Sequence, residues 1–120
     1  MIKELELVEE FHTKFKQPIL TSPSLIPDDR SSNRYCLMKD EVEEYKAGVE
    51  KGDLENIAKE LADILYAVYG TILEHGLQNR MEAIFEEVHR SNMSKDFDEY
   101  KMVKGASYFK ADIKKALGLI

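Results

Sequence analysis

The sequence predicts an all-α protein, a helical bundle built from four main helices. Apolar residues recur at steps of three and four in four segments, and no stretch alternates long enough to build a β-sheet. The composition, 43% hydrophobic and 33% charged, is that of an ordered globular chain. With 120 residues we expect a single domain spanning residues 1–120.

The first helix is expected over residues 2–16. Its apolar stripe consists of Ile2, Leu5, Val8, Phe11 and Phe15. Residues 17–33 then contain all three prolines, four serines and a pair of aspartates, which is the composition of a loop. A loop of this length in so small a domain is usually functional.

Three further helices are predicted from their apolar stripes. The second should cover residues 33–50, with a stripe at Met38, Val42, Tyr45 and Val49. Gly52 breaks it, and Asp53 can cap a third helix that runs from Leu54 and closes near Gly76. The fourth carries Met81, Ile84, Phe85 and Val88. After Ser91 the periodicity fades into a charged tail with a short apolar end at residues 113–120.

Two pairs of carboxylates lie beside the apolar stripes of the second and third helices. Glu41 and Glu44 are three residues apart, as are Glu60 and Asp63, so each pair shares a helix face with Cβ atoms about 5–6 Å apart. Asp63 is the only charged residue between Leu61 and Leu73, and we expect it to be buried and either paired or bound to a cation. Four such oxygen ligands suit Mg²⁺, with Mn²⁺ as a substitute.

Other interpretations of these acids remain open at this point. The chain has 23 acidic residues, which produce such spacings by chance on solvated helix faces, and Lys or Arg could neutralise the acids in a salt-bridged core. A di-iron bundle would require two Glu-x-x-His motifs. Glu86-x-x-His89 supplies one, and Glu9-x-x-His12 is a weak second copy on a helix expected too early in the chain.

These residues also resemble a known family. Residues 37–44 and 60–63 resemble the E-E-x-x-E and E-x-x-D signature of the MazG-like all-α NTP pyrophosphatases. Residues 87–95 and 101–109 resemble the phosphate-binding segment and the Lys-Gly-x-x-Tyr tail of phosphoribosyl-ATP pyrophosphohydrolase-like members. The similarity spans roughly residues 34–113. Asp40 departs from the usual Glu, and Ala106 and Ala111 stand where prolines are common.

The resemblance implies a four-helix-bundle-type fold and a nucleoside triphosphate substrate. Mg²⁺ would grip the triphosphate, and attack by water would release a nucleoside monophosphate and pyrophosphate. The implied metal ligands are Glu41, Glu44, Glu60 and Asp63. Glu41, or its neighbour Asp40, would orient or deprotonate the water.

Cationic and amide groups should complete a triphosphate site, because metal ions alone leave excess negative charge on it. Asn92 and Lys95 are the first candidates, followed by Lys104 and Arg34. No residue announces a particular base. Two alternative functions stay open: hydrolysis of phosphoribosyl-ATP, and a non-catalytic helical interaction module whose oligomer is itself the function.

Charge and hydropathy restrict the partners. The net charge of −6 argues against broad binding to nucleic acid. The longest apolar stretch is too short to span a bilayer, and residues 1–16 are amphipathic rather than signal-like. With a single cysteine, Cys36, we expect a reducing, cytoplasmic location. Apolar helix faces in so short a chain predict a homodimer or homotetramer.

Overall fold

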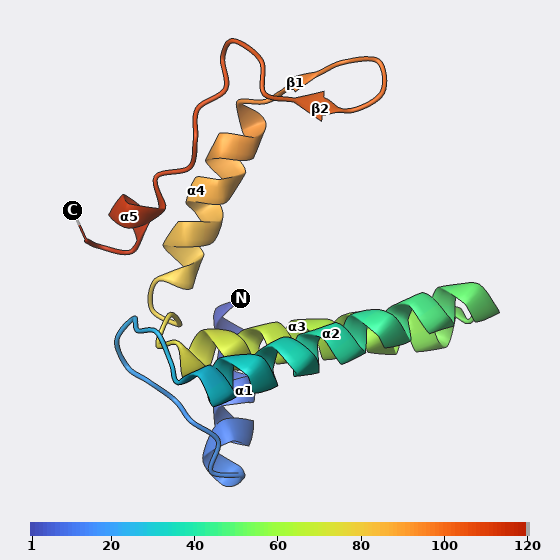
Figure 1. Cartoon of the computed structure of the whole chain (residues 1–120), viewed down its shortest axis with the longest axis vertical. Coiled ribbons are helices and arrows are strands. Elements are labelled where there is room, and N and C mark those ends of the chain that lie inside the picture. Colours follow the sequence, from blue (N-terminus) through green and yellow to red (C-terminus); the bar gives the residue numbers. More distant parts are fainter. Residues whose placement is uncertain (120) are drawn as a thin grey trace. The chain divides into compact units, whose positions relative to one another are not determined.

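The computed structural model describes residues 1–119 and confirms the all-α fold (Figure 1). Its helices are α1 (Ile2–Lys14), α2 (Asp28–Lys51), α3 (Leu54–Glu74), α4 (Met81–Met93) and the single-turn α5 (Ile113–Ala116). The strands β1 (Asp96–Phe97) and β2 (Met102–Val103) form a two-residue antiparallel ladder. No described helix is long and apolar enough to cross a membrane.

The chain forms two compact units. The first, Met1–Gln78, contains α1, α2 and α3, and the second begins at Asn79 and contains the remaining elements. The expectation of one domain over residues 1–120 stays a prediction.

Helices α2 and α3 form a long antiparallel hairpin, and they lie side by side along most of their length (Figure 1). Gly52 ends α2 in the left-handed conformation with φ 65°, where a residue without Cβ is not strained. Asp53 then caps α3, because its side chain accepts a hydrogen bond from Asn56 N at 3.1 Å. The turn therefore directs α3 back along α2.

Gly48 explains how closely the two helices approach. This glycine is buried in α2, and a Cβ added to it would lie 3.0 Å from Asn56 Nδ2 and 3.5 Å from Ile57 Cγ1 of α3. The absence of a side chain thus brings the two backbones together one turn after Glu44.

Helix α2 begins at Asp28, and the expected start at Asn33 was wrong. Pro27 precedes the helix, and its carbonyl accepts hydrogen bonds from Arg30 N and Ser31 N. Asp28 and Asp29 lie in the first turn, where acidic side chains favour the helix dipole. Residues 28–33, which their polar composition assigned to a loop, are therefore helical. Helix α1 ends at Lys14, two residues early, because Lys16 adopts φ 54°.

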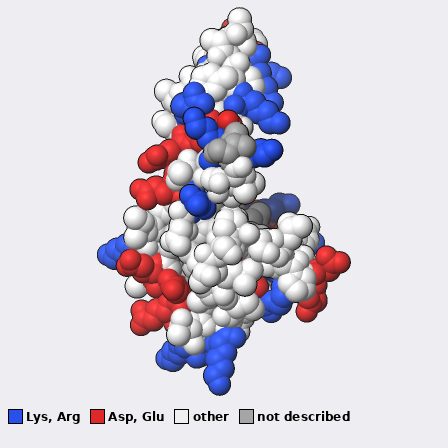
Figure 2. Space-filling view, turned by 90° about the vertical axis from the view of Figure 1, so that its left-hand side faces the viewer, with Lys and Arg blue, Asp and Glu red and all other residues white. Residues whose placement is uncertain are grey.

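Segment 17–27 connects α1 to α2 along the C-terminal end of α3. Leu20 N donates to Leu73 O at 3.0 Å, and Ser24 N donates to His75 O at 2.9 Å. The segment has no charged residue. It lies on the side of the first unit that faces the viewer in Figure 2, where uncharged residues form a broad white surface.

The core of the first unit is small. Leu5 and Val8 of α1 are buried, as are Ile72 and Leu73 of α3. Many large apolar side chains remain exposed on the same helices, among them Leu7 at 53% and Leu65 at 52%. The first unit thus has more apolar surface than its own elements cover.

The second unit contains α4 and the charged tail. Asp98 shapes the turn between β1 and β2 by accepting from Tyr100 N and Lys101 N. Ser91 Oγ donates to Phe109 O at 2.8 Å and thereby ties the tail to α4. Asp112 caps α5 by accepting from Lys115 N. Side-chain bonds therefore hold this segment, which explains why no apolar period announces it.

Candidate active site

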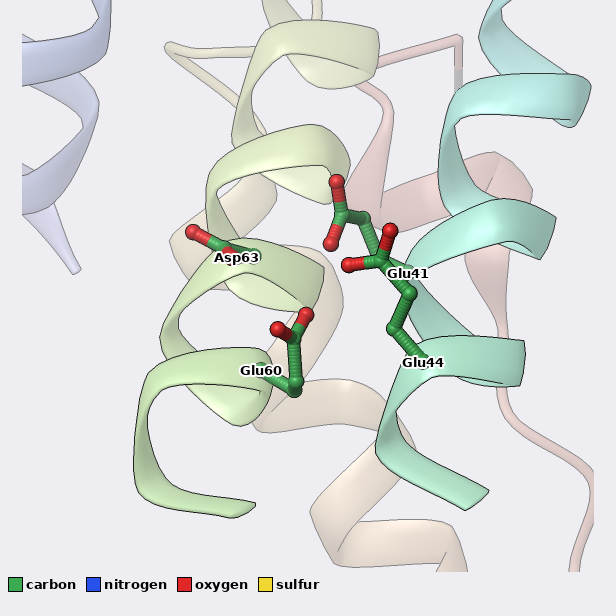
Figure 3. A group of neighbouring side chains, drawn as sticks. All are labelled: Glu41, Glu44, Glu60 and Asp63. Atoms are coloured by element: carbon green, nitrogen blue, oxygen red, sulfur yellow. The ribbon is translucent and has the colours of Figure 1, made fainter. Parts of the chain in front are cut away.

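Four carboxylates from α2 and α3 converge in the first unit (Figure 3). Each contributes one oxygen to a group in which all four atoms lie within 4.8 Å of one another. The members of this four-carboxylate cluster are Glu41, Glu44, Glu60 and Asp63. The sequence thus predicted correctly which four acids come together, because a spacing of three keeps each pair on one face.

The four-carboxylate cluster lacks positive charge on its inner side. Glu60 is only 4% exposed, and Oε2 of both Glu60 and Glu41 is buried without a hydrogen-bond partner. Burial raises the pKa of Glu41 to about 7, helped by the hydrogen bond with Glu60 and by the charges of Glu44 and Asp63. The hydrogen bond and charge of Glu60 also raise the pKa of Glu44.

Asp63 is not the buried member, and that expectation was wrong. Its side chain is 34% exposed, and Lys59 Nζ lies 2.7 Å from its Oδ2. The same ammonium lies 3.6 Å from Glu60 Oε1. Lys59 and Asp63 are one turn apart at the edge of α3, whereas Glu60 faces α2. The salt-bridged arrangement considered above therefore exists, but only on the outer side of the cluster.

A divalent cation fits the residues present. The donors are all carboxylate oxygens, which Mg²⁺ and Mn²⁺ prefer, and two of them are buried without any partner. An ionised carboxylate out of water must be paired or bound to a cation. The exposed ammonium of Lys59 reaches only two of the four acids. The remaining charge is what a bound cation would neutralise.

A cavity of about 190 Å³ adjoins the four-carboxylate cluster. Glu41 and Asp63 line it together with Arg34 and three aromatic residues, Phe11, His12 and Tyr66. We call it the aromatic cavity. It combines anionic, cationic and ring surfaces within the first unit, which is typical of a site for a small polar molecule.

A comparison with protein families identifies the family of the chain. A family model described as phosphoribosyl-ATP pyrophosphohydrolase matches residues 8–92, a range that includes all four carboxylates. The chain belongs to the phosphoribosyl-ATP pyrophosphohydrolase family. This family is part of the MazG-like all-α NTP pyrophosphatase superfamily, as the motifs indicated. A search of curated proteins found no match.

Membership of the phosphoribosyl-ATP pyrophosphohydrolase family makes the chain a pyrophosphohydrolase, a hydrolase of acid anhydrides. The family match covers α2 and α3 completely and ends within α4. The match therefore links the four-carboxylate cluster to hydrolysis. The geometry of the cluster alone indicates only that it needs a cation.

Arg34, which the sequence marked for substrate binding, is held by its neighbours in this family member. It is 6% exposed, and its Nη1 lies 3.2 Å from Glu74 Oε2. Its Nη2 donates to Ala67 O at 2.8 Å, and its Nε donates to Thr71 Oγ1 at 3.1 Å. Arg30 also binds Glu74, through two hydrogen bonds of 3.0 and 2.8 Å. Sequence reasoning missed Arg30 and Glu74, whose 44-residue separation leaves no local signal.

The other expected substrate-binding residues belong to the second unit. Lys95 N donates to Asn92 O just after α4, and Lys104 Nζ lies 5.2 Å from the centre of the Tyr108 ring. Their contact with substrate stays a prediction. The second candidate catalytic acid, Asp40, is exposed and lies outside the four-carboxylate cluster.

Proposed function

We propose that the chain is a Mg²⁺-dependent nucleoside triphosphate pyrophosphohydrolase that releases a nucleoside monophosphate and pyrophosphate. One observation carries the proposal: two facing helices of a pyrophosphohydrolase-family chain bring four carboxylate oxygens within 4.8 Å, and two oxygens of this cluster are buried without partners. Such a site needs a cation, and a triphosphate is the natural ligand of a cation held by carboxylates.

The chain's own residues would divide the work as follows. Glu41, Glu44, Glu60 and Asp63 would hold the cation. A bound divalent cation lowers the pKa of coordinated water and neutralises charge on the phosphate oxygens. Glu41 would orient the attacking water and take its proton, because its carboxylate belongs to the cluster and also lines the aromatic cavity. The water oxygen would bond to the α-phosphorus. The bond between the α-phosphorus and the oxygen that bridges to the β-phosphorus would break, and pyrophosphate would leave with that oxygen.

Phosphoribosyl-ATP is a second candidate substrate, favoured by the description of the matching family model. Hydrolysis of its triphosphate at the same bond also releases pyrophosphate. The substrate alone separates the two candidates, so one experiment can address both.

The test is a substrate panel of canonical and modified nucleoside triphosphates together with phosphoribosyl-ATP, each with Mg²⁺. The expected products are a monophosphate and pyrophosphate, and chelation of the metal should stop the reaction. Release of a diphosphate and inorganic phosphate would contradict the proposed bond cleavage. Turnover of phosphoribosyl-ATP alone would select the second candidate.

A non-catalytic interaction module is the alternative from another functional class. Thermal melts separate it from the enzyme, because a cation that binds only the folded state raises the melting temperature. We expect Mg²⁺ or Mn²⁺ to stabilise the protein. An unchanged melting temperature at millimolar metal, combined with no turnover in the panel, would favour the module.

We also propose that the protein forms a homodimer or homotetramer. The exposed apolar side chains of α1 and α3 support this, since Leu7 and Leu65 line a second, mostly apolar cavity together with Tyr66 and Tyr69. Light scattering at micromolar concentration should give a multiple of the 13.9 kDa chain mass. A mass of one chain would refute this proposal.

A further inference from the structure

We propose that the aromatic cavity binds the base of the nucleotide, with Phe11 and Tyr66 against its ring and His12 and Arg34 at its polar edge. The inference rests on the proposed function and deepens it, because it assigns recognition of the base to residues of α1, α2 and α3. None of these four residues belongs to the four-carboxylate cluster.

The position of the cavity supports this assignment. Glu41 and Asp63 belong to the four-carboxylate cluster and also line the cavity, so the two sites share a wall. A nucleotide whose phosphates meet a cation at the cluster therefore has its uncharged part beside the cavity. The volume of about 190 Å³ suits a single planar ring system rather than a second nucleotide.

The ring surfaces suit a planar ligand. Phe11 is 42% exposed and Tyr66 is 41% exposed, so neither side chain is covered by the rest of the unit. Their ring centres are 5.4 Å apart, and the planes meet at 87°. A base that stacks on one ring meets the edge of the other. Stacking of bases on aromatic side chains is favourable for every base and needs no hydrogen bond.

The polar wall offers an acceptor and a donor near each other. His12 Nδ1 lies 3.0 Å from Pro18 O, and a carbonyl oxygen can only accept. Nδ1 therefore carries the hydrogen, and Nε2 of the neutral ring is free to accept. A Cβ added to Gly70 would lie 2.9 Å from His12 Nε2 and would overlap Arg34 Nη2, so both groups border the same glycine.

Arg34 keeps N–H donors that its neighbours do not use. Its guanidinium uses one N–H each for Glu74, Ala67 and Thr71, which leaves N–H groups of its five for another acceptor. Glu74 is 1% exposed and shares its single negative charge between Arg34 and Arg30. The unused N–H groups can donate to a base oxygen or ring nitrogen. The edge of a base presents such acceptors beside N–H donors.

The test measures binding of four nucleosides, adenosine, guanosine, cytidine and uridine, to the full chain by titration followed with NMR. Nucleosides carry no phosphate, so no metal is needed. We expect at least one to bind wild type. Tyr66→Leu should weaken that binding about tenfold through lost stacking. His12→Asn should also weaken it, because asparagine can still donate to Pro18 O but removes the Nε2 acceptor.

Tyr69→Leu is the matched control, since Tyr69 lies on α3 three residues from Tyr66 and does not line the aromatic cavity. It should bind nucleoside like wild type. All three variants should keep the wild-type Mg²⁺ affinity, and Tyr66→Leu should raise the KM for nucleotide. Tyr66 is partly exposed, so its variant should fold even if His12→Asn is unstable.

The outcomes separate this inference from the proposed function. Wild-type hydrolysis combined with unchanged nucleoside affinity and KM in both cavity variants would overturn the base site and leave the proposed function standing. Absence of hydrolysis, with nucleoside binding that Tyr66→Leu weakens, would overturn the proposed function and support the base site. Absence of nucleoside binding to wild type would overturn the base site directly.

Discussion

Glu60 and Glu74 lie on the same helix, α3, and both are buried, with 4% and 1% of their surface exposed. At the Glu74 end, Arg30 and Arg34 surround the carboxylate with ion pairs of 2.8 and 3.2 Å. At the Glu60 end, the neighbours across the helix pair are Glu41 and Glu44, and Oε2 of Glu60 has no partner.

The difference distinguishes a carboxylate that supports the fold from one that awaits a ligand. A buried carboxylate that is paired with guanidinium groups of the same chain has its charge compensated within the fold and needs no ligand. A buried carboxylate among other acids lowers the stability of the folded state until a cation binds. Such destabilising charges are typical of functional sites. Neutralising substitutions at the two ends should therefore have opposite consequences.

The largest expected effect is on turnover. Glu60→Gln and Asp63→Asn should each lower the turnover number by about a hundredfold or more, because each removes a proposed cation ligand. Folding should survive or improve, since repulsion within the four-carboxylate cluster falls. The measurement is pyrophosphate release at saturating Mg²⁺, together with a thermal melt.

The control for these variants is Glu43→Gln, which makes the same change of charge on an exposed residue of α2 outside the cluster. Its turnover should be close to that of wild type. Equal turnover by all three variants would mean that the four-carboxylate cluster does not carry the chemistry.

At the opposite end, Glu74→Gln should destabilise the protein by about 3 kcal/mol, because it leaves the buried Arg34 guanidinium without its counter-charge. Urea unfolding measures this loss. The stabilisation by Mg²⁺ should remain, because Glu74 is not part of the four-carboxylate cluster. A variant as stable as wild type would show that the two ends differ less than their contacts indicate.

The pH dependence of stability sharpens the comparison. The pKa of Glu41 is about 7 in the folded protein and about 4.5 in the unfolded chain, so between these values the folded state binds the additional proton. The free energy of unfolding without metal should therefore rise as the pH falls from about 7 towards 4.5. Urea unfolding across this range should show the rise, and Glu41→Gln should lack it. Saturating Mg²⁺ should also remove it.

The smallest effect concerns Lys59, whose ammonium group forms an ion pair with Asp63 and approaches Glu60 from the outer side of the cluster. Lys59→Met should tighten Mg²⁺ binding about threefold, because an exposed ion pair that competes for the same oxygens is worth little. Calorimetric titration of the metal measures this change. Lys46→Met, on the exposed surface of α2, serves as the control and should leave the affinity unchanged. Weaker binding by the Lys59 variant would mean that the ammonium orders the acids.

Local periodicity was sufficient to detect the four main helices and the membership of the four-carboxylate cluster, although it placed the start of α2 five residues late. A spacing of three residues fixes Glu41 with Glu44 and Glu60 with Asp63 wherever the helices pack. It does not fix which acid of a pair faces the partner helix. The apolar run around Asp63 therefore pointed to the wrong one, since the packing of α3 against α2 buries Glu60 instead.

Contacts across long sequence distances escaped prediction for a different reason. Arg30 and Glu74 have no pattern that links them. Residues 28–33 have the composition of a loop because they are polar and follow a proline, although the helical turn that they form carries Arg30 to Glu74. The aromatic cavity is similar, since Phe11 and His12 meet Tyr66 only after α1 packs on α3. Neither arrangement could be read from the spacing of residues along one helix.

The glycine at position 48 has a consequence for the choice of ion. Because Asn56 and Ile57 of α3 occupy the place where a side chain at position 48 would stand, the backbone of α2 approaches α3 closely one turn from Glu44. This close approach limits how far apart the carboxylates of the two helices stand and thereby favours a small ion. Mg²⁺ binds oxygen at about 2.0–2.1 Å and Ca²⁺ at about 2.3–2.6 Å, so a methyl group at this contact would act as a spacer that favours the larger ion.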